Sequence, residues 1–131
     1  MPPEQQALTS VLSYEVRSSV RYRRCCSLMV WGGKEVTAQE DGVFNGDLRQ
    51  SDAVFQVGDK VAVLMGETSL EGALRAVNRL KERFTDAKRR VWCGVASFPT
   101  DGDEAKTIMY CAFRRCQDAR MQGSGSVISK D

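Results

Sequence analysis

The sequence feature that most constrains the fold is a change of hydrophobic period within residues 49–77. Two short valine-rich runs, Ala53–Val57 and Lys60–Met65, are separated only by Gly58-Asp59. Valine favours the pleated, half-buried surface of a sheet, and glycine at the first of two central positions favours a type II′ hairpin turn. The pattern therefore predicts two antiparallel strands joined by a tight turn.

An amphipathic helix is predicted directly after the second strand. Thr68 and Glu71 have the spacing of a capping box, in which each side chain satisfies a free backbone N–H at the helix start. The apolar residues that follow recur at helical spacing and would share one face: Leu70, Ala73, Leu74, Val77, Leu80 and Phe84. This part of the chain is thus expected to fold as strand, turn, strand and helix.

The same patterns predict the rest of the chain. Residues 1–6 would form a flexible tail, and residues 32–47 lack a helical period, so a short hairpin of Glu35–Gln39 with Val43–Asn45 is expected there. The other elements are a helix over Ala7–Arg23, a buried central strand over Cys25–Trp31, a strand over Val91–Phe98, a helix over Asp103–Met121 closed by Gly123, and an edge strand over Val127–Ser129. The core is expected to include Val54, Val61, Val63, Leu74, Val77, Val95 and Ile108.

Composition indicates a globular protein of one domain. A chain of 131 residues can bury a core, and its fractions of hydrophobic (42%) and charged (27%) residues are ordinary. The net charge of +2 is too small to argue for nucleic acid or a membrane as the main partner, and no apolar run approaches the roughly 20 residues of a membrane span. We therefore expect a single cytoplasmic domain over residues 1–131, with neither nucleic acid binding nor membrane insertion.

Cysteine and histidine usage limits the chemistry that the chain can perform. The five cysteines form no C-x-x-C pair and histidine is absent, which argues against a zinc site. Without histidine, no catalytic scheme based on an imidazole base is available. The expectation is a protein without a metal site or cofactor, whose thiols are reduced and mostly fill the core.

The order of motifs resembles the GGDEF domain, the catalytic domain of diguanylate cyclases. Arg49-Gln50-Ser51-Asp52 stands at the family's R-x-x-D position, and Gly58-Asp59-Lys60-Val61 stands at its signature turn, one residue short. Val91–Pro99 is similar to the V-x-x-G-V-A-x-x-P strand, and Ala119–Gly123 is similar to A-K-x-x-G. The resemblance implies an α/β (α+β) fold like the nucleotidyl-cyclase palm. Its mixed, mainly antiparallel sheet would be flanked by helices and shortened between the first strand and the hairpin.

The residues on which cyclase activity would depend are altered. In the family, an aspartate after the first strand and the signature glutamate bind the divalent metal; here Gly32 or Gly33 and Lys60 stand at those positions. A protonated ammonium repels Mg²⁺ and cannot coordinate it, and Asp59 alone is a typical turn residue. The F-K-x-x-N-D segment that grips guanine is also missing. The resemblance therefore implies a degenerate domain with no catalytic residues and no cyclase activity.

The R-x-x-D element is the family site that remains intact. The resemblance implies that Arg49 and Asp52 bind cyclic di-GMP, as this motif does at the family's inhibitory site. An arginine fork can donate to guanine O6 and N7, and a carboxylate can accept from guanine N1–H and the N2 amino group. A structural interpretation stays open, in which Asp52 hydrogen-bonds backbone at the start of the strand and Arg49 is its solvated partner.

Two hypotheses of function follow from these motifs. In the first, the chain is an inactive signalling or regulatory protein that acts as a cyclic di-GMP receptor and switches a partner interaction. In the second, it is a ligand-free module for protein–protein interaction, such as a scaffold or a homodimer, that keeps the cyclase fold for its surfaces. The expected partners are thus cyclic di-GMP in the first case and a protein, including a second copy of the chain, in both.

Overall fold

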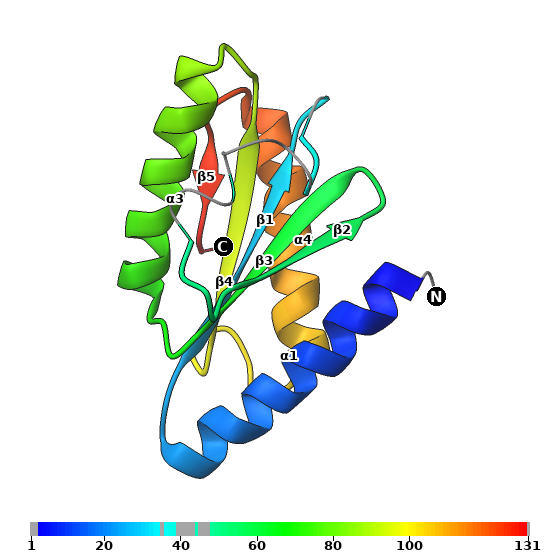
Figure 1. The fold of residues 1–131 in the computed structure, drawn as a ribbon, viewed down its shortest axis with the longest axis vertical. Helices are drawn as coiled ribbons and strands as arrows, with labels where there is room; N and C mark the ends of the chain where they lie inside the picture. Colours follow the sequence, from blue (N-terminus) through cyan, green and yellow to red (C-terminus); the bar gives the residue numbers. More distant parts are fainter. Residues whose placement is uncertain (1–2, 35, 39–43, 45–47, 131) are drawn as a thin grey trace.

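A single mixed sheet, covered by helices on both faces, forms the frame of the molecule (Figure 1). The computed structural model describes residues 3–34, 36–38, 44 and 48–130. Over these residues the elements are α1 (Pro3–Tyr22), β1 (Cys26–Gly32), β2 (Ala53–Val57), β3 (Lys60–Gly66), α3 (Leu70–Asp86), β4 (Trp92–Phe98), α4 (Ala105–Gln122) and β5 (Val127–Ile128). The strand order is β2-β3-β1-β4-β5, and every neighbouring pair is antiparallel except β4 with β5. The predicted mixed, mainly antiparallel sheet is therefore confirmed.

Alternation along the central strand divides the core into two layers. Met29 and Trp31 of β1 pack with the apolar face of α3, whereas Leu28 and Val30 pack on the other face with α1 and α4. All seven residues of β1 are buried, as the apolar run predicted. Gly94 of β4 lets α4 approach closely, because a Cβ there would lie 2.2 Å from the backbone nitrogen of Cys116.

The predicted core is confirmed at most positions. Five of its residues are fully buried, namely Val61, Val63, Val77, Val95 and Ile108. Val54 and Leu74 are half-buried and pack against the α3 layer. Val54 lies on the edge strand β2, which has a neighbouring strand on one side only, and this position explains its partial exposure.

The hairpin and the following helix form as predicted, with one correction at the helix cap. Val57 pairs with Lys60 across the turn, and Gly58 has a φ of 62°, as the first central position of a type II′ turn requires. The cap of α3 is Ser69 and not Thr68, since the Ser69 hydroxyl accepts a hydrogen bond from the Gly72 backbone N–H at 3.2 Å. Thr68 is buried and makes other contacts, which are described with the candidate site.

The first residues of the chain and the segment after β1 differ from the predictions or lie partly outside the described residues. Residues 3–6, predicted to be part of a tail, belong to the start of α1. The predicted hairpin within residues 35–45 lies largely outside the described residues. In its described part, residues 36–38 form no strand and Phe44 has helical backbone. Phe44 is buried against Phe84 of α3, with ring centroids 5.6 Å apart, so this residue belongs to the α3 layer.

A buried ion pair that the sequence did not reveal joins α4 to the end of β4. The Arg115 side chain is only 3% exposed and donates to Asp101 Oδ1 at 2.8 Å and to the Val95 carbonyl at 2.9 Å. The other carboxylate oxygen of Asp101 accepts from the Ser97 backbone N–H at 2.8 Å. The pair therefore fixes the turn after β4 against the helix.

Replacing Arg115 with methionine should lower the free energy of unfolding by about 3–5 kcal/mol, because Asp101 would keep a buried charge without its partner. Urea denaturation of the purified protein measures this loss. Arg24→Met is the matched control, since Arg24 pairs with Glu67 at an exposed site and should cost at most about 1 kcal/mol. Equal losses in the two variants would contradict a stabilising role of the buried pair.

Candidate functional site

The signature turn lies beside the end of β1, as the resemblance implied. Trp31 pairs with Val61 in the antiparallel register of β1 and β3, so the chain after β1 reaches the turn between β2 and β3. A hollow of about 410 Å³ opens there. It is lined by Gly32, Gly33, Lys34, Asp59, Lys60, Trp92 and Arg120.

The charges at this hollow do not fit a divalent metal. Asp59 is 87% exposed and its Oδ1 lies 3.1 Å from Nζ of Lys60; this hydrogen bond and the charge of Lys60 lower the pKa of the Asp59 carboxyl. A Mg²⁺ site needs several oxygen ligands, and the described residues contain no group of three or more histidine, cysteine, aspartate or glutamate side chains that could hold a metal. The lining that the structure describes has one carboxylate and three cations, which favours anions.

Arg49 and Asp52 of the R-x-x-D element lie at the opposite end of β1 and bind each other. Asp52 Oδ1 lies 3.0 Å from Nη2 of Arg49, and Asp52 Oδ2 accepts from the Arg49 backbone N–H at 2.8 Å. The Asp52 side chain is only 1% exposed, whereas that of Arg49 is 50% exposed. The carboxylate thus holds the arginine at the start of β2.

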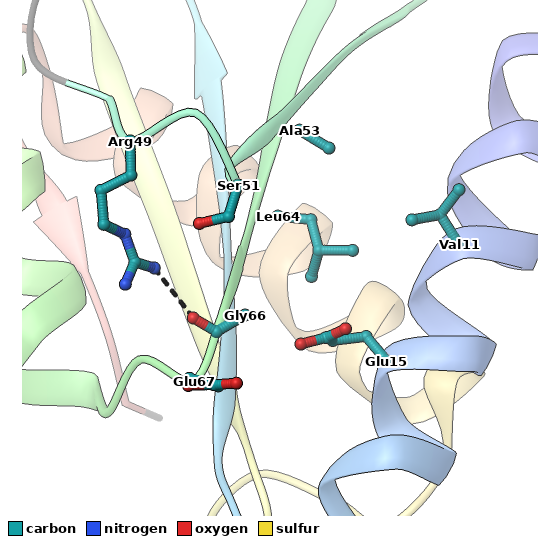
Figure 2. A pocket seen from close by; sticks show the side chains of 8 residues that line it. All are labelled: Val11, Glu15, Arg49, Ser51, Ala53, Leu64, Gly66 and Glu67. Atoms are coloured by element: carbon teal, nitrogen blue, oxygen red, sulfur yellow. Dashed lines mark hydrogen bonds between the residues drawn. The ribbon is translucent and has the colours of Figure 1, made fainter.

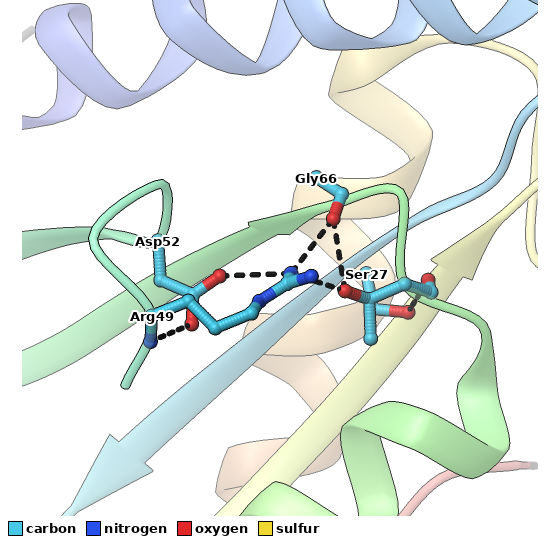
Figure 3. A network of polar contacts seen from close by, with 5 residues as sticks. Ser27, Arg49, Asp52 and Gly66 are labelled. Atoms are coloured by element: carbon cyan, nitrogen blue, oxygen red, sulfur yellow. Dashed lines mark hydrogen bonds and ion pairs between the residues drawn. The ribbon is translucent and has the colours of Figure 1, made fainter. Parts of the chain in front are cut away.

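A polar network extends this pair to the end of β3 and the start of α3 (Figure 3). Nη2 of Arg49 donates to the Gly66 carbonyl at 2.8 Å and to the Thr68 hydroxyl at 2.6 Å. Thr68 in turn donates to Gly66, and its carbonyl accepts from the Ser27 hydroxyl of β1 at 2.8 Å. The guanidinium is therefore fixed to the end of β3. The hydroxyl of Thr68 is hydrogen-bonded within this network and does not cap α3.

Two further arginines, which the sequence analysis missed, lie in the same place. A hollow of about 290 Å³ is lined by Arg49, Asp52, Thr68, Ser69, Arg75 and Arg79, among others. Arg75 and Arg79 are one helical turn apart on α3, and this i, i+4 spacing was the available signal. The hollow also lies at the N-terminus of α3, where the helix dipole favours anions. Three arginines stand against two carboxylates, Asp52 and Glu67, and the helix N-terminus adds partial positive charge, so the hollow has a net positive lining that suits a phosphate-bearing ligand.

A third hollow, of about 440 Å³, separates α1 from the hairpin (Figure 2). Val11 and Glu15 reach into it from α1, and Leu64 and Gly66 border it on β3. The Glu15 carboxylate lies so close to Gly66 that a Cβ at this glycine would be 2.2 Å from Glu15 Oε1. The hollow combines apolar groups with two carboxylates, Glu15 and Glu67, and one cation, Arg49, so it is less cationic than the other two.

The cysteines do not form a reactive site. All five are free thiols; Cys26, Cys93 and Cys116 are buried, and Cys25 and Cys111 are half-buried. Burial raises the pKa of Cys26 and of Cys116 to about 11 each, and it raises that of Cys93 as well. These three thiols stay protonated at neutral pH and fill the core, as predicted.

Comparison with known proteins identifies the fold. No protein-family model matches the sequence, and no curated protein matches it. Among solved structures, the GGDEF domain of YfiN (TpbB) from Pseudomonas aeruginosa superposes with a TM-score of 0.83 at 20% identity, covering 94% of this chain and 92% of that one. The active GGEEF domain of a diguanylate cyclase from Vibrio cholerae gives a TM-score of 0.81 at 13% identity, covering 96% of each chain.

A third similar structure is a microbial GGDEF domain described in its interaction with cyclic di-GMP. Its TM-score is 0.76 at 17% identity, covering 92% of this chain and 86% of that one. The chain therefore has the GGDEF fold, which confirms the palm-like α+β architecture implied by its motifs. In the part of the chain that the structure describes, no helix is long and apolar enough to cross a membrane.

The contacts of Asp52 lead to a prediction about stability. Asp52→Ala should lower the free energy of unfolding by about 1–3 kcal/mol, because the Arg49 backbone N–H and guanidinium lose a buried acceptor. Thermal and urea denaturation measure the change. Asp59→Ala is the control, and at this exposed turn position the effect should stay within about 0.5 kcal/mol. If Asp52→Ala were as stable as this control, the network would not anchor the start of β2.

Proposed function

We propose that this chain is a catalytically inactive GGDEF-like signalling domain that binds cyclic di-GMP in the hollow at Arg49. The observation that carries the proposal is the grouping of Arg49, Arg75 and Arg79 around one hollow beside the first half of α3. The similarity to a GGDEF domain known in its interaction with cyclic di-GMP supports the choice of ligand.

The roles of the residues follow from their contacts. The half-exposed guanidinium of Arg49 is held in place by Asp52, Gly66 and Thr68, so it can meet a guanine base by hydrogen bonding or stacking without first being ordered. Arg75 and Arg79 would neutralise the two phosphates of the ligand. Because both oxygens of Asp52 already accept from Arg49, we assign Asp52 a positioning role in place of the predicted contact with guanine.

A protein partner completes the proposed signalling role. The solved complex of the Pseudomonas aeruginosa diguanylate cyclase SiaD with its activator SiaC has a TM-score of 0.77 at 15% identity, covering 95% of this chain and 57% of that one, and in it a cyclase is bound to its activator. We propose that the present chain likewise transmits its ligand state to a protein partner or to a second copy of itself.

Binding should be measurable by isothermal titration with cyclic di-GMP. Arg49→Ala and Arg79→Ala should each weaken binding by about 1–3 kcal/mol, the size of a good bidentate guanine contact or of a hydrogen bond to a charged group. Arg17→Ala on α1, which lines none of the hollows described above, is the charge-matched control and should bind like the wild type. Cyclic di-AMP should bind more weakly, because adenine presents an amino donor where guanine presents O6.

Two results would contradict the receptor proposal. The first is the absence of heat and of a thermal shift at saturating cyclic di-GMP. The second is an equal loss of affinity in the Arg17→Ala control. The first result would leave the ligand-free interaction module as the better hypothesis. The second would show that binding follows net charge and does not take place at the Arg49 hollow.

The proposed lack of catalysis has its own test. Incubation with GTP and Mg²⁺ or Mn²⁺ should yield no cyclic di-GMP by chromatography, because Lys60 and Gly32 or Gly33 replace the residues that would hold the metal. The Vibrio cholerae domain named above is the positive control for the assay. Product that disappears in Asp59→Ala would show that the turn still supports metal-dependent chemistry.

A further inference from the structure

The hollow at Arg49 contains a carboxylate whose role the proposed function leaves open, that of Glu67. Asp52 and Glu67 are the two carboxylates of its described lining. The Asp52 side chain is only 1% exposed, and both of its oxygens accept from Arg49. The Glu67 side chain is 59% exposed. Glu67 is therefore the carboxylate of this hollow that a ligand can reach.

Glu67 lies between the two residues that hold the Arg49 guanidinium. Nη2 of Arg49 donates to the Gly66 carbonyl at 2.8 Å and to the Thr68 hydroxyl at 2.6 Å, and these residues directly precede and follow Glu67. Arg49 nevertheless takes Asp52 as its carboxylate partner. A fixed cation and a separate carboxylate thus border the same hollow.

Arg24, which follows α1, orients the Glu67 carboxylate. Nη1 of Arg24 binds Oε1 of Glu67, and among the described residues Arg24 is the one partner of this carboxylate. An ionised carboxylate has two acceptor oxygens. One oxygen of Glu67 is therefore held by the protein, and Oε2 keeps its capacity to accept from a ligand.

The backbone at Glu67 has a conformation that glycine adopts more easily. Its φ is 51°, in the left-handed region. The other described non-glycine residues with positive φ are Arg23 and Lys88, which lie within two residues of the ends of α1 and α3, where such a residue commonly ends a helix. Glu67 follows a strand and precedes a helix, so no helix ending explains its backbone. Strained backbone that persists in this way is typical of functional sites.

We propose that Glu67 determines the base specificity of the Arg49 hollow by accepting from the Watson–Crick edge of guanine. The inference rests on the proposed function and deepens it. Guanine presents the acceptors O6 and N7 on one edge and the donors N1–H and the N2 amino group on the next. An arginine and a carboxylate that border one hollow can read both edges. Adenine presents N1, an acceptor, in place of N1–H, and the carboxylate would repel it.

A purely structural role of Glu67 predicts the opposite effect on binding. If Glu67 were only the surface partner of Arg24, its negative charge would oppose the phosphates that the arginines of the hollow attract. Removal of the charge would then strengthen the binding of any cyclic dinucleotide. If Glu67 reads guanine, its removal weakens binding of the guanine ligand in particular.

Isothermal titration of Glu67→Met with cyclic di-GMP and cyclic di-IMP tests the inference. Cyclic di-IMP keeps O6 and N1–H of guanine and lacks the N2 amino group. The wild type should bind it roughly tenfold more weakly than cyclic di-GMP, the size of a hydrogen bond to a charged group. In Glu67→Met the affinity for cyclic di-GMP should fall roughly tenfold or more, and the ratio of the two affinities should approach one. Glu67→Gly, which relieves the strained backbone, should behave in the same way.

Glu71→Met is the matched control, because Glu71 carries the same charge in the first turn of α3 but does not line the hollow. Its affinity for cyclic di-GMP should not fall, and the ratio of affinities should stay that of the wild type. If the Glu67 variants bound cyclic di-GMP as tightly as the wild type or kept its ratio, the inference would be overturned. The receptor proposal would still stand in that case, provided that Arg49→Ala weakened binding. Failure of the wild type to bind cyclic di-GMP would overturn both.

Discussion

Strand β1 is buried on both faces and hydrogen-bonded along both edges, and the rest of the structure is arranged around it. Burying each of its large apolar side chains contributes about 1.5–3 kcal/mol, which only a sheet covered on both sides can provide. Because β3 runs antiparallel to β1, the turn that precedes β3 and the segment that follows it lie at opposite ends of β1. The turn before β3 lies beside Gly32, and the segment after β3 lies beside Ser27.

The two ends of β1 carry different charge chemistry. At the N-terminal end, one buried carboxylate orients a half-exposed arginine, and α3 adds two more arginines and its own dipole. At the other end, cations stand where a cyclase would hold its metal with carboxylates, and one exposed aspartate is bound by the neighbouring lysine. Cations therefore line a hollow at each end of β1.

Local patterns in the sequence were sufficient for most of the fold. The hairpin, the apolar face of α3, the buried run of β1 and the capping role of Gly123 depend on residues near one another in the chain, so period and turn chemistry predict them. The error at the α3 cap is instructive. Thr68 and Ser69 both suit an N-cap. The Thr68 hydroxyl accepts a hydrogen bond from Arg49, nineteen positions earlier in the chain, and Ser69 caps the helix instead.

The sequence by itself therefore determined the order and type of the elements. It also singled out Arg49 and Asp52 as candidate site residues and showed that the signature turn is altered. Only the tertiary structure decided which distant side chains lie in the same place: Arg79 and Arg49 line one hollow, Lys34 and residues 88–90 line another, and Arg115 pairs with Asp101. The physical reason is that these contacts depend on how helices and loops pack on the two faces and ends of β1. Hydrophobic period reports which face of an element is buried, but it carries no information about which charged side chains of other elements lie beside it.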